Sequence, residues 1–141
     1  MRIIGRKEII DLPDLDLSGI QAKIDTGAYG CALHCHKMKT ITKDGVEFLQ
    51  FQLLDPSHPE YEDKYYFSQN FREKKVKNSS GKVEHRFVIH SSIRIFNKSY
   101  KVEFSLTNRK NMKYPILLGR KFLRRKFLVD VSLKNLSIKS N

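Results

Sequence analysis

Apolar and polar side chains alternate along two consecutive stretches of the chain, residues 87–95 and 100–106, and this pattern constrains the fold most. Every second residue from Phe87 to Ile95 lies on one face, and that face is mostly apolar. An alternation with a period of two is typical of a strand with one buried face. Asn97-Lys98 is expected to turn the chain between the two stretches, so together they predict a long β-hairpin.

Other segments also favour strands. Ile20, Ala22 and Ile24 alternate with polar residues, and residues 46–54, rich in Phe and Leu, follow a hairpin turn at Asp44-Gly45. A pattern of this kind over most of the chain predicts a mostly-β fold.

The remaining segments are short. Residues 120–126 suit a helix with two apolar side chains facing the core, and residues 127–131 suit a closing strand. Residues 55–63 contain two prolines and are predicted to form an exposed loop. Because no internal repeat or long linker divides the chain, we expect a single domain over residues 1–141.

Composition restricts the class of protein. The chain is 40% hydrophobic and 30% charged, and no apolar run approaches the roughly 20 residues of a membrane span. The N-terminus does not have the pattern of a signal peptide, so a cytoplasmic location is expected. Cys31 and Cys35 are too few for a disulfide framework.

The formal net charge is +12. Such a surface attracts polyanions, namely nucleic acid, an anionic membrane or an acidic peptide. Net charge informs about partners and association rates, but it does not identify a fold. Since basic proteins without a nucleic-acid function are common, nucleic acid is not the partner we expect.

The sequence Asp25-Thr26-Gly27-Ala28 directly follows one of the apolar strands. In isolation these residues indicate a simple turn at a strand end. Far downstream, the apolar segment that begins at Tyr114 ends in Gly119 before the expected helix. In one half of a retropepsin, an apolar strand leads into Asp-Thr-Gly, and further along the chain two apolar residues and a glycine precede a helix. The two segments of this chain resemble that arrangement.

Longer stretches strengthen this resemblance: Ala22–Ala28, Ala32–His34, Leu106–Arg109, Met112, Leu117–Arg120 and Phe127–Asp130. As a set they resemble a bacterial family labelled ATP-dependent zinc protease, whose members often occur with glutamate ligases. The resemblance implies an all-β, retropepsin-like closed barrel with one short C-terminal helix. None of these matching stretches falls within residues 55–85, so the resemblance is weakly supported there. The chain also departs from the family at Cys31, where a small hydroxyl residue is usual.

The family label itself finds no support in the motifs. Use of ATP would require a glycine-rich phosphate loop with a Lys, and a familiar zinc peptidase would show His-Glu-x-x-His on a helix. Neither pattern occurs in the sequence. We therefore expect neither ATP nor zinc dependence, and no cofactor; the chemistry that remains is that of carboxylates.

The resemblance assigns catalysis to Asp25, Thr26 and Gly27. An aspartic peptidase needs two neighbouring carboxylates that share one proton, one acting on a water and the other on the scissile carbonyl. Because the chain has a single Asp-Thr-Gly, the second Asp25 must come from a second subunit, which predicts a homodimer. Thr26 would fix the geometry by hydrogen bonding, and Gly27 would allow close approach of substrate.

Ala28, Arg109 and Arg120 are the candidate substrate-binding residues. A guanidinium can bind a carboxylate through two hydrogen bonds, so each arginine could help form a pocket for an acidic substrate. The alternative is a structural role, in hydrogen bonds to the backbone or in a salt bridge to a residue such as Asp130. The sequence leaves both interpretations open.

Cys31, His34, Cys35 and His36 form the one cluster of the metal-binding type. On a strand the two cysteines would share one face and the two histidines the other, which argues against a single ion. The same alternation argues against a Cys nucleophile assisted by a neighbouring His. We therefore predict no metal site, although an irregular segment would leave zinc open.

The favoured function is peptide-bond hydrolysis by an Asp25 dyad, with acidic or glutamate-tailed proteins as the hypothetical substrates. The rival is a non-catalytic module of the same fold that binds an acidic partner or RNA, since fold alone is weak warrant for activity. Either residues 55–64 or residues 71–82 could cover the cleft, and the sequence does not decide between them.

Overall fold

The computed structural model describes residues 1–77, 80–108 and 113–138. Most of its elements are strands, as the alternating pattern predicts. In chain order the elements are β1 (Arg2–Ile4), β2 (Lys7–Leu12), a 3-10 turn (Pro13–Leu15), β3 (Leu17–Ile24), β4 (Cys31–Lys43), β5 (Val46–Leu53), β6 (Tyr66–Ser68), β7 (Phe71–Lys77), β8 (Val83–Ile95), β9 (Lys98–Thr107), β10 (Ile116–Leu118), α1 (Arg120–Leu123), β11 (Phe127–Val129) and a second 3-10 turn (Leu136–Ile138).

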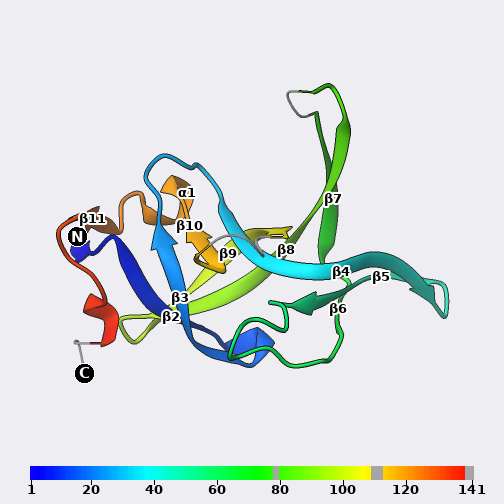
Figure 1. Cartoon of the computed structure of the whole chain (residues 1–141), viewed down its shortest axis with the longest axis horizontal. Helices are drawn as coiled ribbons and strands as arrows, with labels where there is room; N and C mark the ends of the chain where they lie inside the picture. The colour runs from blue at the N-terminus through cyan, green and yellow to red at the C-terminus, as the bar shows by residue number, and fades with distance from the viewer. Residues whose placement is uncertain (78–79, 109–112, 139–141) are drawn as a thin grey trace.

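Within these ranges, six strands close a barrel in the order β10-β3-β2-β8-β9-β4, and β10 then pairs with β4 (Figure 1). Closure satisfies the edges of the sheet. The inward side chains form one apolar core, in which Phe51 and Phe104 are among the largest fully buried residues. Burying a side chain of this size contributes roughly 2 kcal/mol. The expected closed, all-β barrel is confirmed.

Strand β10 brings together the two parts of the sequence motif. It lies between β3, to which it is parallel, and β4, to which it is antiparallel. In this register Leu118 lies beside Ile24, the last residue of β3. Asp25, which follows β3, and Gly119, which follows β10, therefore emerge side by side at one end of the barrel.

Strands β8 and β9 form the predicted long hairpin, with Ile89 directly opposite Phe104. Its turn lies one residue earlier than predicted. Phe96 and Asn97 both have positive φ, 52° and 60°, and Lys98 already begins β9. Two central residues with positive φ are typical of the tight turn that matches the twist of a hairpin.

The C-terminal elements are shorter than the sequence predicts. Helix α1 ends at Leu123 instead of residue 126, because Arg124 leaves the helical conformation and Arg125 has a φ of 64°. Strand β11 ends at Val129 instead of residue 131. Phe122 and Leu123 are buried, as predicted. None of the helices in the described ranges has the length and apolar character needed to cross a membrane.

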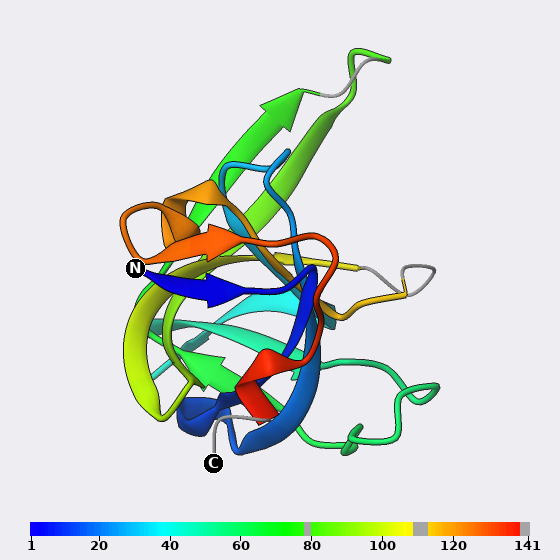
Figure 2. The same cartoon turned by 90° about the vertical axis from the view of Figure 1, so that its left-hand side faces the viewer.

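A separate two-stranded sheet joins the two ends of the chain. Strand β1 pairs with β11 in parallel, and Ile3 lies opposite Leu128 (Figure 2). These two side chains are 48% and 55% exposed, and Met1 beside them is 80% exposed. Within the described residues neither strand pairs with any other strand. The sheet thus presents an apolar outer face and open edges, a combination typical of an interaction surface.

Candidate active site

Asp25 lies at the start of the loop that joins β3 to β4. Its backbone N–H donates to the carbonyl oxygen of Leu118 at 2.9 Å, so β10 fixes its position. The carboxylate Oδ1 accepts a hydrogen bond of 2.9 Å from the N–H of Gly27, and the side chain is half-buried. One carboxylate oxygen thus orders the turn, while the group stays accessible from outside the barrel.

Gly119 packs against this loop. A Cβ atom at this position would lie 2.2 Å from the carbonyl oxygen of Gly30, 2.7 Å from that of Tyr29 and 2.8 Å from that of Ala28. Its φ of −96° is open to any residue, so the requirement for glycine is one of space. Gly119 is therefore both the residue before α1 and the surface on which the Asp25 loop rests.

Arg120 holds the same loop through hydrogen bonds to the backbone. Its guanidinium donates to the carbonyl oxygen of Thr26 at 3.0 Å, and its backbone N–H donates to that of Ala28 at 2.9 Å. The guanidinium also lies 5.8 Å from the centre of the exposed Tyr29 ring. The structural interpretation of Arg120 is thus supported, and its exposed side chain keeps further donors for a ligand.

The two other predictions about arginines have different outcomes. Arg109 lies outside the described residues, so its assignment to substrate binding stays a prediction. The suggested salt bridge of Asp130 with Arg120 is not formed, whereas one with Arg109 stays a prediction. The carboxylate of Asp130 accepts hydrogen bonds from the N–H and the hydroxyl of Ser132, at 2.9 and 2.6 Å, and these lower its pKa.

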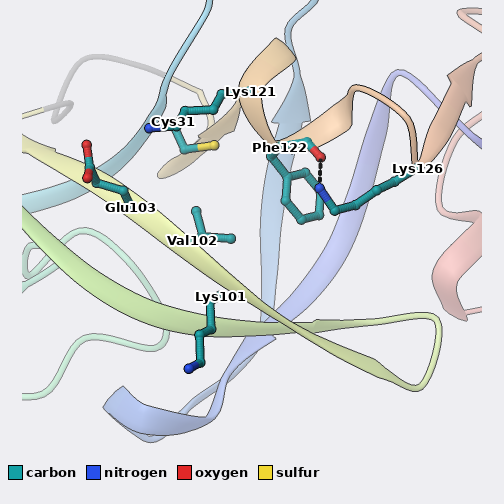
Figure 3. A pocket seen from close by; sticks show the side chains of 7 residues that line it. All are labelled: Cys31, Lys101, Val102, Glu103, Lys121, Phe122 and Lys126. Atoms are coloured by element: carbon teal, nitrogen blue, oxygen red, sulfur yellow. Dashed lines mark hydrogen bonds between the residues drawn. The ribbon is translucent and has the colours of Figure 1, made fainter.

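Cys31 borders a cavity of about 120 Å³ near the Asp25 loop (Figure 3). The figure shows its sulfur on the side of Val102 and Phe122. Burial raises the pKa of the Cys31 thiol, although a hydrogen bond from Gly119 and the charges of two lysines oppose the shift. A buried thiol with a raised pKa is a poor nucleophile at neutral pH.

The other cysteine and the two histidines take separate positions. Cys35 is fully buried, and burial raises its thiol pKa well above the ordinary value. The His36 ring bonds to the carbonyl oxygen of Leu54 at 2.5 Å, and the His34 ring shares a hydrogen bond of 2.5 Å with the Asp55 carboxylate. In the part of the chain that the structure describes, no three metal-binding side chains are placed to hold one ion.

The pair of His34 and Asp55 was missed by sequence reasoning, which placed residues 55–63 in an exposed loop. Asp55 is 6% exposed and His34 is 3% exposed. Ser57, which donates to the carboxylate through its hydroxyl and its N–H, and His34 hold the pKa of Asp55 well below its ordinary value. A buried acid at the head of a Pro-rich loop leaves little trace in the sequence, because its partner lies 21 residues earlier.

We expect Asp55→Asn to lower the free energy of unfolding by about 3 kcal/mol at neutral pH, because it removes a buried carboxylate that is hydrogen-bonded to Ser57 and to the His34 ring. The folded-state pKa of Asp55 is depressed, so its contribution is fully present above about pH 4 and is lost as the pH falls. Urea unfolding between about pH 3 and pH 7 should therefore show a difference between the two proteins that narrows in acid. Asp44→Asn, in an exposed turn, should stay within about 0.5 kcal/mol of the parent. Equal stability of Asp55→Asn and the parent at pH 7 would contradict this assignment.

The hairpin β7–β8 and the Asp25 loop project from the same end of the barrel, as both views show (Figures 1 and 2). The segment of residues 55–64, between β5 and β6, lies at the other end in both views. Of the two candidate covers, the described part of residues 71–82 is therefore the one at the same end of the barrel as the Asp25 loop. The part of this hairpin at residues 78–79 lies outside the described ranges.

The sequence matches the RimB-like family, described as retropepsin-like aspartic endopeptidase RimB, over residues 3–140. The chain belongs to this family. The match confirms both the retropepsin-like fold and the resemblance inferred from the motifs around Asp25 and Gly119. The match also extends through residues 55–85, where the sequence motifs had given little support for the resemblance.

Among similar proteins, one from Desulfotalea psychrophila is 31% identical over 137 residues, which are 94% of this chain and 29% of that protein. One from Shewanella halifaxensis is 33% identical over 134 residues, 92% of this chain and 28% of that protein. Both are named "Probable alpha-L-glutamate ligase". This chain thus spans less than a third of the length of these relatives.

A solved structure from Legionella pneumophila, of a protein of unknown function, has a TM-score of 0.74 and 30% identity. The alignment covers 96% of this chain and 98% of that one. The barrel with its projecting hairpins is therefore similar to a fold that has been observed experimentally.

Proposed function

We propose that this chain is an aspartic-type peptidase that hydrolyses peptide bonds with two Asp25 carboxylates, one from each subunit of a homodimer. The observation that carries the proposal is the Asp25 loop itself. It presents one accessible carboxylate, ordered by the N–H of Gly27 and held in place by Leu118 and Arg120. A single carboxylate does not suffice for this chemistry, which is why a second copy is part of the proposal.

In the proposed reaction the two carboxylates share one proton, since like charges so close together do not both ionise. The ionised carboxylate takes a proton from a water, whose oxygen attacks the carbonyl carbon of the scissile bond. The protonated carboxylate gives its proton to the carbonyl oxygen. Collapse of the tetrahedral intermediate then breaks the C–N bond. The leaving amine takes the proton that the first carboxylate removed from water, and a hydroxyl of the intermediate returns a proton to the second carboxylate.

The proposed substrates are acidic or glutamate-tailed polypeptides. The net charge of +12 favours such partners. The relatives named as glutamate ligases contain a region similar to this chain within a longer protein. A peptidase beside a ligase that adds glutamate would act on acidic products. Arg120 is exposed and contacts the loop at Thr26, so its guanidinium could bind an acidic side chain near the dyad.

The proposed dimer uses the outer face of the β1–β11 sheet. Ile3 and Leu128 lie opposite each other there and are about half exposed. The sheet connects to the site through Arg6, just after β1, whose carbonyl oxygen accepts a hydrogen bond of 2.9 Å from the N–H of Ile24. Thr26 is exposed, so its hydroxyl is available to a second subunit.

Sedimentation equilibrium tests this arrangement. We expect the parent to sediment at twice its chain mass of 16.5 kDa and Leu128→Glu to sediment as a monomer without peptidase activity. The matched control is Val46→Glu, at an apolar residue 39% exposed on the β4–β5 hairpin, which should remain dimeric. A parent that is monomeric at high concentration would overturn the dyad. It would leave the rival, a binding module for an acidic partner or RNA.

A further inference from the structure

The hairpin β7–β8 carries a strong excess of positive charge on a segment that projects from the barrel (Figures 1 and 2). Its exposed cationic side chains are Arg72, Lys74, Lys75, Lys82 and Arg86. Over residues 71–75 and 80–87 the acidic residues are Glu73 and Glu84. Isolated exposed lysines are ordinary, but a cluster on one projecting hairpin requires an explanation.

The pairing of the two strands places two like charges directly opposite each other, because Lys74 lies opposite Arg86. Like charges in cross-strand positions destabilise a hairpin. No packing against the barrel requires them here, because both side chains are exposed.

The acids nearby are already engaged. Glu73 pairs with His85, Glu84 lies 3.3 Å from Arg86, and Glu103 of β9 pairs with Arg72. Across the described ranges, neither Lys74 nor Lys75 has a carboxylate within 4.0 Å. Within the described residues, Lys74 thus faces another cation, Arg86, and has no carboxylate partner of its own.

We propose that this hairpin is a docking arm for an acidic polypeptide segment, which binds across Lys74 and Arg86. Side chains on one face of an extended peptide recur about every 7 Å, which matches the spacing of Arg72 and Lys74 along β7. Each incoming carboxylate would relieve the repulsion between Lys74 and Arg86 by bridging them. The site is separate from Asp25 but lies at the same end of the barrel.

An acidic peptide fits this surface better than a single-stranded nucleic acid. Binding of single strands generally combines positive charge with exposed aromatic rings on which bases stack. The aromatic residues in the described part of the hairpin, Phe71 and Phe87, pack on each other at its base, with ring centres 6.3 Å apart, and are half-buried. The hairpin therefore offers charge without a stacking surface.

This inference rests on the proposed function only in treating the acidic segment as part of a substrate, because docking needs no intact Asp25. The test uses the Asp25→Asn protein, so that cleavage does not interfere. Fluorescence anisotropy with a labelled oligoglutamate peptide should show the dissociation constant rise about tenfold in Lys74→Gln/Arg86→Gln. The matched control is Lys39→Gln/Lys43→Gln, which removes the same charge from the β4–β5 hairpin and should change binding less than about twofold.

A second measurement separates docking from a structural role. Removing two opposed charges should leave the melting temperature of Lys74→Gln/Arg86→Gln equal to or higher than that of the parent. Equal weakening by the control pair would mean that net charge alone binds the peptide and would overturn the proposal. If Lys74→Gln/Arg86→Gln lost binding to single-stranded RNA but still bound oligoglutamate as the parent does, the hairpin would be a nucleic-acid site. That result would overturn the proposal as well. Docking that survives in a peptidase-inactive parent would leave the inference standing while the proposed catalysis fails.

Discussion

Asp25→Asn should abolish peptide hydrolysis, lowering the rate roughly a thousandfold or more, because an amide cannot exchange the proton that the dyad shares. The fold should persist. An Asn side chain has the same size and keeps an oxygen that accepts the 2.9 Å hydrogen bond from the N–H of Gly27. The measurement is hydrolysis of an acidic peptide, followed by separation of the products, together with the melting temperature of each protein.

Asp11→Asn is the matched control. Its Oδ1 accepts a hydrogen bond of 2.8 Å from the N–H of Gly19, so the same chemical change occurs at a comparable carboxylate-to-backbone hydrogen bond between β2 and β3. This variant should keep full activity. If Asp25→Asn retained the parent's rate, or if both variants lost activity equally, Asp25 would not be the catalytic carboxylate.

Gly119→Ala should destabilise the protein by about 3 kcal/mol or more and disrupt the site at the same time. The added methyl group would approach three backbone oxygens of the Asp25 loop, the nearest at 2.2 Å. Backbone atoms do not rotate away as a flexible side chain would, so either the loop or α1 must shift. The hydrogen bonds from Arg120 to Thr26 and Ala28 depend on that contact. Urea unfolding gives the loss of stability, and peptide hydrolysis gives the loss of function.

Gly30→Ala is the control for this prediction. A Cβ at Gly30 would meet nothing within 4 Å, and its φ lies outside the positive range, so the substitution should change stability by less than about 0.5 kcal/mol. Equal stability of Gly119→Ala and Gly30→Ala would show that the loop does not rest on Gly119. The pair thus tests whether close packing at one glycine supports the site.

Sequence patterns predicted the strands well where apolar and polar side chains alternate over many residues. The β8–β9 hairpin appears with its apolar face as expected, and Asp44-Gly45 turns the chain with φ values of 52° and 78°. These features depend on neighbouring residues, so local propensity was sufficient. The turn at Phe96 was placed one residue late, because Phe rarely adopts positive φ and gave no signal.

The candidate site was predictable in its residues but not in its supports. The Asp-Thr-Gly motif identified Asp25, and the apolar-apolar-Gly segment identified Gly119, but their contact depends on β10 lying between β3 and β4. The buried pair of His34 and Asp55 and the opposed charges of Lys74 and Arg86 likewise come from non-local pairing. Such relations are set by register between distant strands, which a single sequence does not encode in any local pattern.

The most direct test of a dyad shared between two subunits is to mix active and inactive chains. Parent and Asp25→Asn chains are unfolded together, refolded in varied ratios at constant total concentration, and assayed for hydrolysis of an acidic peptide. If each active site needs one Asp25 from both subunits, activity follows the square of the parent fraction, so an equal mixture retains about a quarter of the parent's activity. Activity that falls in direct proportion to the parent fraction, to about half in the equal mixture, would show that each chain acts alone and would contradict the account.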